Sequence, residues 1–183
     1  MSDTMAQQLR FLLDREAIRD VVTRYCRGVD RMDEAVLASV YWPEATHDHG
    51  LFTGKASDFI PVVLNMAGIT DQMHHLIGNI LIRNSGDTAR CETYFHAYQR
   101  MRGEKGPYDY IVAGRYLDEL ERRGGEWRII RRKAVFDWFR EYPDSADWSQ
   151  GLHGTPVPMG GRLPEDASVA LFAQDRLDLP AGS

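Results

Sequence analysis

Two adjacent histidines begin an apolar stretch, residues 73–82, whose composition is that of a strand buried on both faces. Because side chains alternate along a strand, His75 and Asn79 are expected on one face and His74 on the other. Histidine has an ordinary pKa of ~6.5, so it can take a proton from a substrate and later return one. A polar His-x-x-x-Asn set among apolar neighbours is typical of a pocket wall. Alternatively, His75 is a satisfied core histidine at a half-exposed strand start.

A second polar group lies in the segment 45–50, where His47, Asp48 and His49 follow one another. On a short strand His47 and His49 share a face, as two ligands of a metal would. Two histidines do not complete a zinc site, so we expect no metal. The chain also lacks the G-x-G-x-x-G, P-loop and G-x-S-x-G patterns, which leaves nucleotide, flavin and serine-hydrolase functions unsupported. We therefore expect no cofactor.

The composition is that of an ordinary globular protein: 43% of the 183 residues are hydrophobic and 27% are charged, which favours a single domain. The net charge of −5 argues against nucleic acid or an anionic membrane as a partner. Cys26 and Cys91 lie far apart without a C-x-x-C pattern, which indicates reduced thiols in a cytoplasmic protein. No run approaches the ~20 apolar residues of a membrane span, and we expect no signal peptide.

Helices are predicted in the first third of the chain. Residues 6–28 should form a long amphipathic helix that Gly28 weakens at its end. Asp33 is a candidate N-cap for a short second helix, which the segment 41–43 closes. A third helix is predicted from residue 57 or 58 to residue 68. The apolar residues at helical spacing in the first helix are Leu9, Leu12, Leu13, Ile18, Val21, Val22, Tyr25 and Val29.

After the third helix the pattern changes from helical spacing to strand alternation. Four long strands joined by turns are expected to form an antiparallel meander. They cover residues 73–82, 88–101, 108–122 and 127–140. Helices followed by such a meander define an α+β fold. A strongly curved sheet wrapped around the long N-terminal helix would make a cone with a small-molecule pocket.

The chain is divided into a domain at residues 1–142 and a C-terminal tail at residues 143–183, where the periodicity is lost. One helical turn is expected around residues 168–172. The tail is richer in apolar residues than a disordered segment usually is. These residues are Trp148, Leu152, Val157, Met159, Leu163, Val169, Leu171 and Phe172. We expect the tail to fold back as a lid over the pocket or, as the alternative, as a strap on a neighbouring subunit.

Six short motifs in a fixed order resemble the SnoaL-like branch of the nuclear-transport-factor-2-like superfamily, the branch of scytalone dehydratase, hexachlorocyclohexane dehydrochlorinase and bile acid 7α-dehydratase. The motifs cover roughly residues 6–140, and the ordered set is more specific than any one of them. In chain order they are Tyr25-x4-Asp30, Tyr41-Trp42-Pro43, His75-Leu76-Ile77-Gly78, Gly114-Arg115-Tyr116-Leu117-Asp118, Trp127-Arg128-Ile129 with Arg131-Arg132, and Phe136-Asp137-Trp138. The resemblance implies the cone-shaped, cystatin-like fold of that superfamily.

The resemblance also implies a histidine–aspartate dyad. His75 matches the family's catalytic histidine, and Asp30 matches the aspartate that orients it. Tyr25 matches a tyrosine of the bile acid enzyme and a lysine of the dehydrochlorinase. A carboxylate on one ring nitrogen would fix the tautomer of His75 and stabilise the imidazolium that forms. Tyr25 could donate a hydrogen bond to an oxyanion or to a leaving hydroxyl group.

Tyr25 and Asp30 are separated by about 140° on a regular helix, so both reach one site only if the helix ends or kinks between them. Gly28 offers that break. Alternatively, Tyr25 is a core tyrosine, and Asp30 caps the next helix or pairs with Arg27 or Arg31.

On the substrate side, the resemblance places Arg132 near an arginine of the last strand, and the register leaves Arg131 or Lys133 as alternatives. An arginine can hold a substrate carboxylate, enolate or phenolate. His49 falls where scytalone dehydratase has a tyrosine. Val29 stands where that enzyme has a second tyrosine, so scytalone is not the expected substrate. The expected substrate-binding residues are Arg132, His49, Asn79 and Trp42.

These residues suit a cofactor-independent lyase that acts on a small aromatic or polycyclic molecule in aromatic-compound catabolism, by general-base proton removal. Dehydration is the leading reaction, and C–C cleavage such as loss of formaldehyde begins in the same way. A polyketide- or steroid-type isomerase or cyclase is the second hypothesis. The third is a non-catalytic binding module or a structural protein like the dioxygenase β subunit, because fold alone does not fix function.

The expected partners are a small-molecule substrate and further copies of this chain. Both faces of several predicted strands are too apolar for one of them to remain in water. The resemblance implies a symmetric homotrimer, with a dimer as the alternative.

Overall fold

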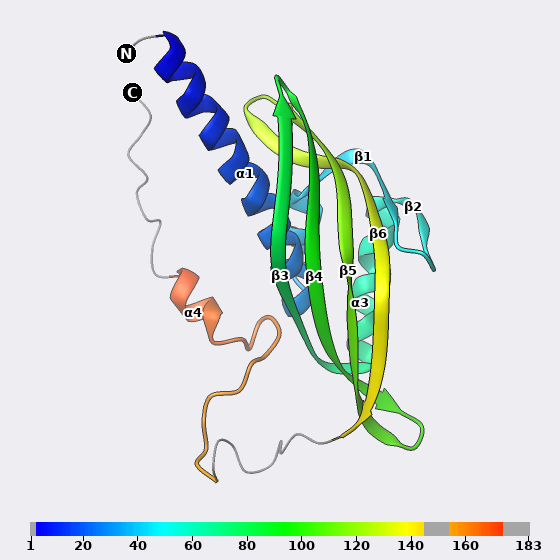
Figure 1. Cartoon of the computed structure of the whole chain (residues 1–183). Helices are drawn as coiled ribbons and strands as arrows, with labels where there is room; N and C mark the ends of the chain where they lie inside the picture. Colours follow the sequence, from blue (N-terminus) through cyan, green and yellow to red (C-terminus); the bar gives the residue numbers. More distant parts are fainter. Residues whose placement is uncertain (1–2, 145–153, 174–183) are drawn as a thin grey trace.

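The computed structural model of the chain describes residues 3–144 and 154–173, which form one sheet with helices packed on it (Figure 1). The first half of the chain holds α1 (Asp3–Arg31), α2 (Glu34–Ser39), β1 (Tyr41–Asp48), β2 (Thr53–Lys55), α3 (Ala56–Asn65) and a 3₁₀ turn at Met66–Gly68. The second half holds β3 (Thr70–Ser85), β4 (Thr88–Gly103), β5 (Gly106–Arg123), β6 (Glu126–Pro143) and the short helix α4 (Ser168–Ala173).

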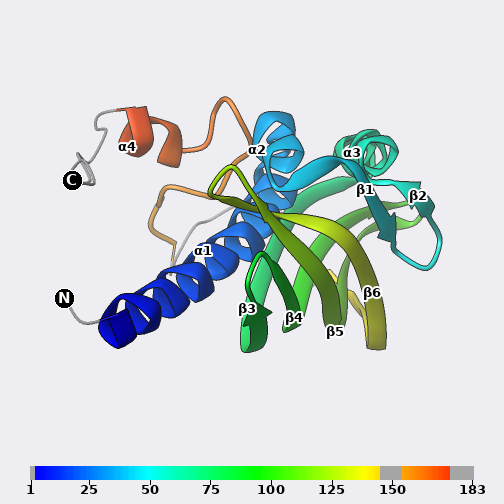
Figure 2. The same ribbon diagram turned by 90° about the horizontal axis from the view of Figure 1, so that it is seen from above.

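The sheet has six strands in the order β2-β1-β6-β5-β4-β3. Strands β3 to β6 form the antiparallel meander that the sequence predicts, with each strand a few residues longer than expected. Strand β1 pairs in parallel with β6, which makes the sheet mixed. The sheet curves when seen from above (Figure 2). The α+β fold with a long N-terminal helix is thus confirmed.

The junction between α2 and β1 differs from the expectation in one respect. Asp33 caps α2 as predicted, because its carboxylate accepts a hydrogen bond from the Val36 backbone N–H at 3.0 Å. The helix then ends at Ser39, and Tyr41 already begins β1. The predicted helix-closing segment is therefore the start of a strand.

Helix α1 packs its C-terminal half against the sheet. Ile18 and Val22 are fully buried there, whereas Leu9, Leu12 and Leu13 nearer the N-terminus are exposed, because that end extends past the sheet (Figure 1). The row of apolar side chains on α1 is therefore longer than the part of the helix that the sheet covers.

The expected helix break at Gly28 is wrong, since α1 continues through Gly28 to Arg31. A β-carbon at Gly28 would lie 2.8 Å from Cγ of Leu37, so glycine is needed for the close approach of α1 and α2. Tyr25 and Asp30 therefore stand on one uninterrupted helix.

The described part of the tail packs on its own chain, along the end of α1 and the start of β3. The Leu163 backbone N–H donates to the Arg31 carbonyl at 3.1 Å. The Arg162 guanidinium donates to the carbonyl and the hydroxyl of Thr70 at 2.9 and 2.7 Å. Asp166 forms an ion pair with Arg31, with 3.3 Å between Oδ2 and Nε. These contacts place the tail beside the two elements that carry Asp30 and His75.

Helix α4 confirms the helical turn that the sequence predicts in the tail. Its Leu171 and Phe172 side chains are about two-thirds exposed. Trp148 and Leu152 lie outside the described residues. None of the described helices is both long and apolar enough to cross a membrane.

Candidate active site

Asp30 and His75 form the centre of the site. Oδ1 of Asp30 lies 2.6 Å from Nδ1 of the His75 ring, and Oδ2 accepts the His75 backbone N–H at 2.9 Å. Asp30 stands on the last turn of α1, and His75 stands on β3, an edge strand of the sheet. Both side chains are at least nine-tenths buried. The predicted contact is therefore present, and Nε2 of His75 has no hydrogen-bond partner among the described residues.

Arg132, on β6, is fully buried. Its Nε and Nη2 atoms donate to the two carboxylate oxygens of Asp118 at 2.7 and 2.6 Å. The guanidinium also lies 3.9 Å from the ring centre of Tyr25 and 4.4 Å from that of Tyr116. Its third nitrogen, Nη1, has no hydrogen-bond partner in the described part of the chain.

The structure shows which of the three neighbouring basic residues on β6 faces the interior. Arg132 is fully buried, whereas Arg131 and Lys133 are exposed. Burial opposes the charge on Arg132, but the adjacent Asp118 carboxylate raises the pKa of Arg132 well above its ordinary value. The guanidinium therefore stays charged inside the fold. The Arg132–Asp118 pair was not predicted from the sequence, although Asp118 ends one of the six motifs.

Tyr25 lies within this cluster rather than in water. Only 2% of it is exposed, and burial raises the pKa of its hydroxyl group above the ordinary value. Its ring contacts the rings of Tyr41 and Tyr116 edge to face, with centres 6.2 and 5.4 Å apart. Tyr25 is thus a core tyrosine and a neighbour of Arg132 at the same time, and its hydroxyl group stays protonated at neutral pH.

His47 on β1 and His49 in the turn after it form a hydrogen-bonded chain with Tyr41. The Tyr41 hydroxyl group lies 2.8 Å from Nδ1 of His47, and Nε2 of His47 lies 3.1 Å from Nδ1 of His49. His47 is fully buried and stacks on Phe59, with ring centres 3.8 Å apart. The described residues contain no group of three or more His, Cys, Asp or Glu side chains that could hold a metal ion.

Both imidazoles are held in the neutral form. Burial, together with the positive charge of Arg132, lowers the pKa of His47 to about 2 and that of His49 to about 4. A charge on His75 also lowers the pKa of His49, whereas Asp48 opposes the shift. His49 and His75 therefore interact electrostatically across the interior.

Aromatic rings link these two histidines along the inner face. The His49 ring meets Phe136 edge to face at 5.2 Å between centres, Phe136 meets Phe95 at 6.2 Å, and Phe95 lies 6.4 Å from His75. Phe95 also stacks on Tyr116 at 4.4 Å. An aromatic wall of this kind suits an apolar or aromatic substrate.

Asn79 does not share the face of His75. The register of β3 against β4 shifts between Ile77 and Ile80, so one extra residue is inserted there. Such a bulge reverses the alternation beyond it. Ile80 therefore turns inward, and Asn79 is exposed. The placement of Asn79 beside His75 is wrong for this reason.

Trp42 is also far from the dyad. Its indole N–H donates to the Glu121 carbonyl at 3.1 Å, and the guanidinium groups of Arg123 and Arg128 lie 4.8 and 4.9 Å from the centre of its ring. These residues belong to the β5–β6 hairpin end. With a strand rise of ~3.3 Å per residue, that end is roughly 30 Å along the sheet from the row of His75. Trp42 therefore fastens β1 to the hairpin and does not reach a substrate at His75.

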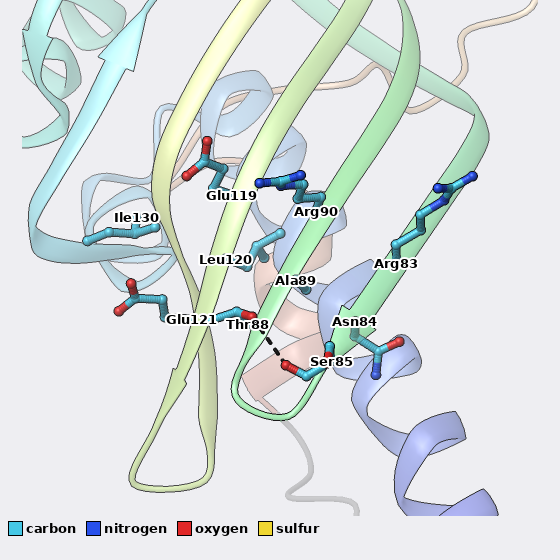
Figure 3. A pocket seen from close by; sticks show the side chains of 10 residues that line it. All are labelled: Arg83, Asn84, Ser85, Thr88, Ala89, Arg90, Glu119, Leu120, Glu121 and Ile130. Atoms are coloured by element: carbon cyan, nitrogen blue, oxygen red, sulfur yellow. Dashed lines mark hydrogen bonds between the residues drawn. The ribbon is translucent and has the colours of Figure 1, made fainter.

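Two surface hollows, of about 430 and 460 Å³, lie on the sheet away from the dyad. Figure 3 shows the first of them, with its side chains on the strands and α1 behind the sheet. Arg83, Arg90 and Glu119 line both hollows. Charges of both signs at a strand surface are typical of a solvated face rather than of a selective ligand site.

A profile of the SnoaL-like domain matches residues 10–133, which is most of the chain. The chain belongs to the SnoaL-like domain family. Its fold is that of the nuclear-transport-factor-2-like superfamily, as the sequence resemblance implies. The matched residues include the dyad and the Arg132–Asp118 pair.

Curated and solved relatives of this SnoaL-like protein include dehydrochlorinases. It is 26% identical to the γ-hexachlorocyclohexane dehydrochlorinase of Sphingobium indicum over 139 residues, which are 70% of this chain and 83% of that protein. The crystal structure of a LinA type 2 hexachlorocyclohexane dehydrochlorinase superposes with a TM-score of 0.71 at 22% identity, covering 79% of this chain and 99% of that one. A candidate scytalone dehydratase from Novosphingobium aromaticivorans gives 0.65 at 20% identity, covering 74% and 91%. At such identities the superpositions show the fold alone.

Proposed function

We propose that the chain is a cofactor-independent lyase that acts on a small aromatic or polycyclic substrate. The observation that supports this most strongly is the 2.6 Å contact between Asp30 and the His75 ring, which leaves the second ring nitrogen without a partner among the described residues. An imidazole held in this way can act as a general base at its free nitrogen, and the carboxylate stabilises the imidazolium that forms.

The neighbouring groups suit the second half of an elimination, the departure of a leaving group. Nη1 of Arg132, which has no hydrogen-bond partner among the described residues, offers a fixed N–H donor, and the protonated Tyr25 hydroxyl group lies against the same guanidinium. Fixed donors of this kind stabilise charge that develops on an oxygen or another leaving atom. Because Asp118 holds the guanidinium on two sides, Arg132 has little freedom to follow a moving ligand.

The relatives support the reaction type. Dehydrochlorination is an elimination that removes a proton and a chloride, and two hexachlorocyclohexane dehydrochlorinases are 26% identical to this chain. For this chain we propose dehydration first and C–C cleavage such as deformylation second. Both reactions begin when His75 removes a proton from the substrate. A polyketide- or steroid-type isomerase or cyclase would use the same base. The dyad itself argues against a purely structural role.

The setting of the enzyme is part of the proposal. We propose a small molecule as its substrate, a homotrimer as its assembly with a dimer second, and the cytoplasm as its location. Cys26 and Cys91 are buried and form no disulfide, which suits a reducing compartment. The tail from residue 143 would act as a lid or as an inter-subunit strap.

Deuterium exchange tests the proposal before the natural substrate is found. The protein is incubated in D₂O with a panel of β-hydroxy ketones, aryl-substituted diols and γ-hexachlorocyclohexane, and products are followed by mass spectrometry. We expect the unmodified protein to catalyse deuterium exchange or elimination with at least one compound. We expect His75→Ala to catalyse neither reaction. A mass loss of water or formaldehyde identifies the lyase, whereas an isobaric product identifies an isomerase. If no compound reacts faster than with His75→Ala, the proposal fails.

A further inference from the structure

The contacts between Tyr41, His47 and His49 form a hydrogen-bonded chain with a direction. Two arrangements of protons fit the distances of 2.8 and 3.1 Å. In the first, the Tyr41 hydroxyl group donates to Nδ1 of His47, and Nε2–H of His47 donates to Nδ1 of His49. In the second, every proton points the other way, so that His49 donates to His47 and His47 donates to the Tyr41 oxygen.

Only the first arrangement satisfies the buried donors. In the second, the Tyr41 proton would need another acceptor, and its other polar neighbour among the described residues, the Arg132 guanidinium, can only donate. Tyr41 is 4% exposed, and an unpaired hydroxyl proton there would carry the full cost of desolvation. The nearby positive charge of Arg132 also favours a proton that points away from it. The chain therefore runs from Tyr41 outward to His49.

We propose that Tyr41 and His47 are positioning residues that hold His49 as a neutral imidazole with its Nε2–H free to donate a hydrogen bond to a substrate. The acceptor would be an uncharged oxygen or halogen next to the carbon that loses its proton to His75. This role rests on the proposed lyase function, but the tautomer itself does not depend on turnover. His49 would thus be a fixed electrophilic donor, opposite in function to the basic His75.

The surroundings of His49 keep it neutral in the working pH range. Burial lowers the pKa of His49 most, and the charge of Arg132 on β6 lowers it further. A proton on His75 of β3 would act in the same direction, and Asp48 beside it on β1 opposes the shift. The Phe59 and Phe136 rings cover the imidazole, at 5.0 and 5.2 Å between ring centres. Nδ1 is already used by His47, so only Nε2 remains for a ligand.

Nitrogen-15 NMR of the histidine side chains tests the tautomer in the full chain without any substrate. We expect both His47 and His49 to show the neutral Nε2–H pattern from pH 8 down to pH 5.5. That tautomer should dominate by about five- to tenfold, the change that one net hydrogen bond produces. An Nδ1–H tautomer for His49, or a protonated His49 at pH 6, overturns the inference even if the protein is an active lyase.

Tyr41→Phe tests the positioning role, because it keeps the ring and removes only the donor. We expect both tautomers of His47 and His49 to appear in that variant, while Tyr98→Phe leaves the pattern unchanged. Tyr98 is a matched control, since its hydroxyl group donates instead to Asp109 at 2.7 Å. An unchanged His49 spectrum in folded Tyr41→Phe contradicts the role of Tyr41.

A pair of small probes tests the donor in the unmodified protein, so that the test survives if Tyr41→Phe does not fold. Acetophenone carries a carbonyl acceptor, and ethylbenzene has nearly the same shape without one. We expect acetophenone to shift the His49 Nε2–H resonance at least about twofold more than ethylbenzene at equal saturation. Equal shifts mean that no hydrogen bond forms, and the donor role is then wrong.

Discussion

Asp30 holds His75 at two points, through Nδ1 of the ring at 2.6 Å and through the backbone N–H at 2.9 Å. Strand β3 is at the edge of the sheet, so the outward N–H of His75 has no neighbouring strand to bond. One carboxylate therefore satisfies an edge-strand donor and orients the imidazole. The position of the base is tied to the end of α1 in this way.

Asp30→Asn is expected to lower kcat by roughly 10²- to 10⁴-fold with the fold intact. An amide has one carbonyl oxygen for two donors, so either the ring or the backbone N–H of His75 would face an NH₂ group. A ring facing NH₂ takes the other tautomer, in which Nε2 carries the proton and is no longer a base. Steady-state kinetics and circular dichroism of the variant check this.

Two matched variants serve as controls for the dyad. Asp20→Asn lies on the same helix, where Asp20 pairs with Arg24 at the surface. His74→Ala removes an exposed imidazole next to His75. Both should retain activity within about twofold, whereas His75→Ala should not. Retention of activity in Asp30→Asn or His75→Ala would contradict the catalytic assignment.

Replacing Arg132 alone is expected to destabilise the protein by ~3–5 kcal/mol, because Asp118 would remain buried without its partner. Arg132→Met is the suitable variant, and urea denaturation is the measurement. The double variant Arg132→Met/Asp118→Leu should recover much of that loss. Arg19→Ala, which breaks a surface pair with Glu16, should cost only ~0–1 kcal/mol. A loss below ~1 kcal/mol in Arg132→Met would show that the pair is not structural.

Stability should fall on acidification below pH 6.5 because of His47 and His49. Their folded-state pKa values are lowered from 6.5 to about 2 and about 4. Between these values the two imidazoles bind protons in the unfolded chain but not in the folded chain. Their contribution is complete above pH 6.5 and is lost as the pH falls, by up to ~1.4 kcal/mol per pH unit for each ring. Urea midpoints at pH 6.5, 5.5 and 4.5 measure it.

The control for this pH dependence is a comparison of variants. His49→Gln should flatten the slope between pH 6.5 and pH 4.5, whereas His74→Ala should leave it unchanged, since His74 is exposed. A slope that is the same in His49→Gln and in the unmodified chain would mean that other groups cause the acid sensitivity.

The meander could be predicted from the sequence because it depends on local patterns. Alternation along β4, β5 and β6 defines long strands, and Asp33 marks the start of α2. Asp30 and His75 could be paired only through the family motifs, since 45 residues separate them. Their spacing in the sequence alone does not bring them together.

The errors have physical causes in pairings that lie between distant strands. The bulge at Gly78 and Asn79 leaves no trace in the alternation, because neither residue signals which face it occupies. His47 meets Arg132 only through the parallel pairing of β1 with β6, and Asp118 joins that same row from β5. Such a row of charged and polar groups becomes visible only once the strand order is known.

The chain is expected to form a homo-oligomer through the sheet face opposite to His75. Leu76, Leu81 and Trp138 on that face are 64, 57 and 44% exposed, which is costly for three large apolar side chains in water. Light scattering should give the mass of a trimer, with a dimer as the second expectation. Leu76→Arg should dissociate it, and Leu51→Arg, at a fully exposed position between β1 and β2, should not. A stable monomer at micromolar concentration contradicts the assembly.

Truncation after Tyr142 is expected to lower kcat/KM by about tenfold or more while the oligomer persists, as a lid requires. The reason is that Leu163 and Arg162 bond to Arg31 and Thr70, on the elements that carry the dyad. Arg162→Ala releases this contact in the full chain and should reproduce part of the loss. Kinetics and light scattering of both variants distinguish the alternatives. Dissociation into monomers favours a strap between subunits, and unchanged kinetics and mass would contradict both roles.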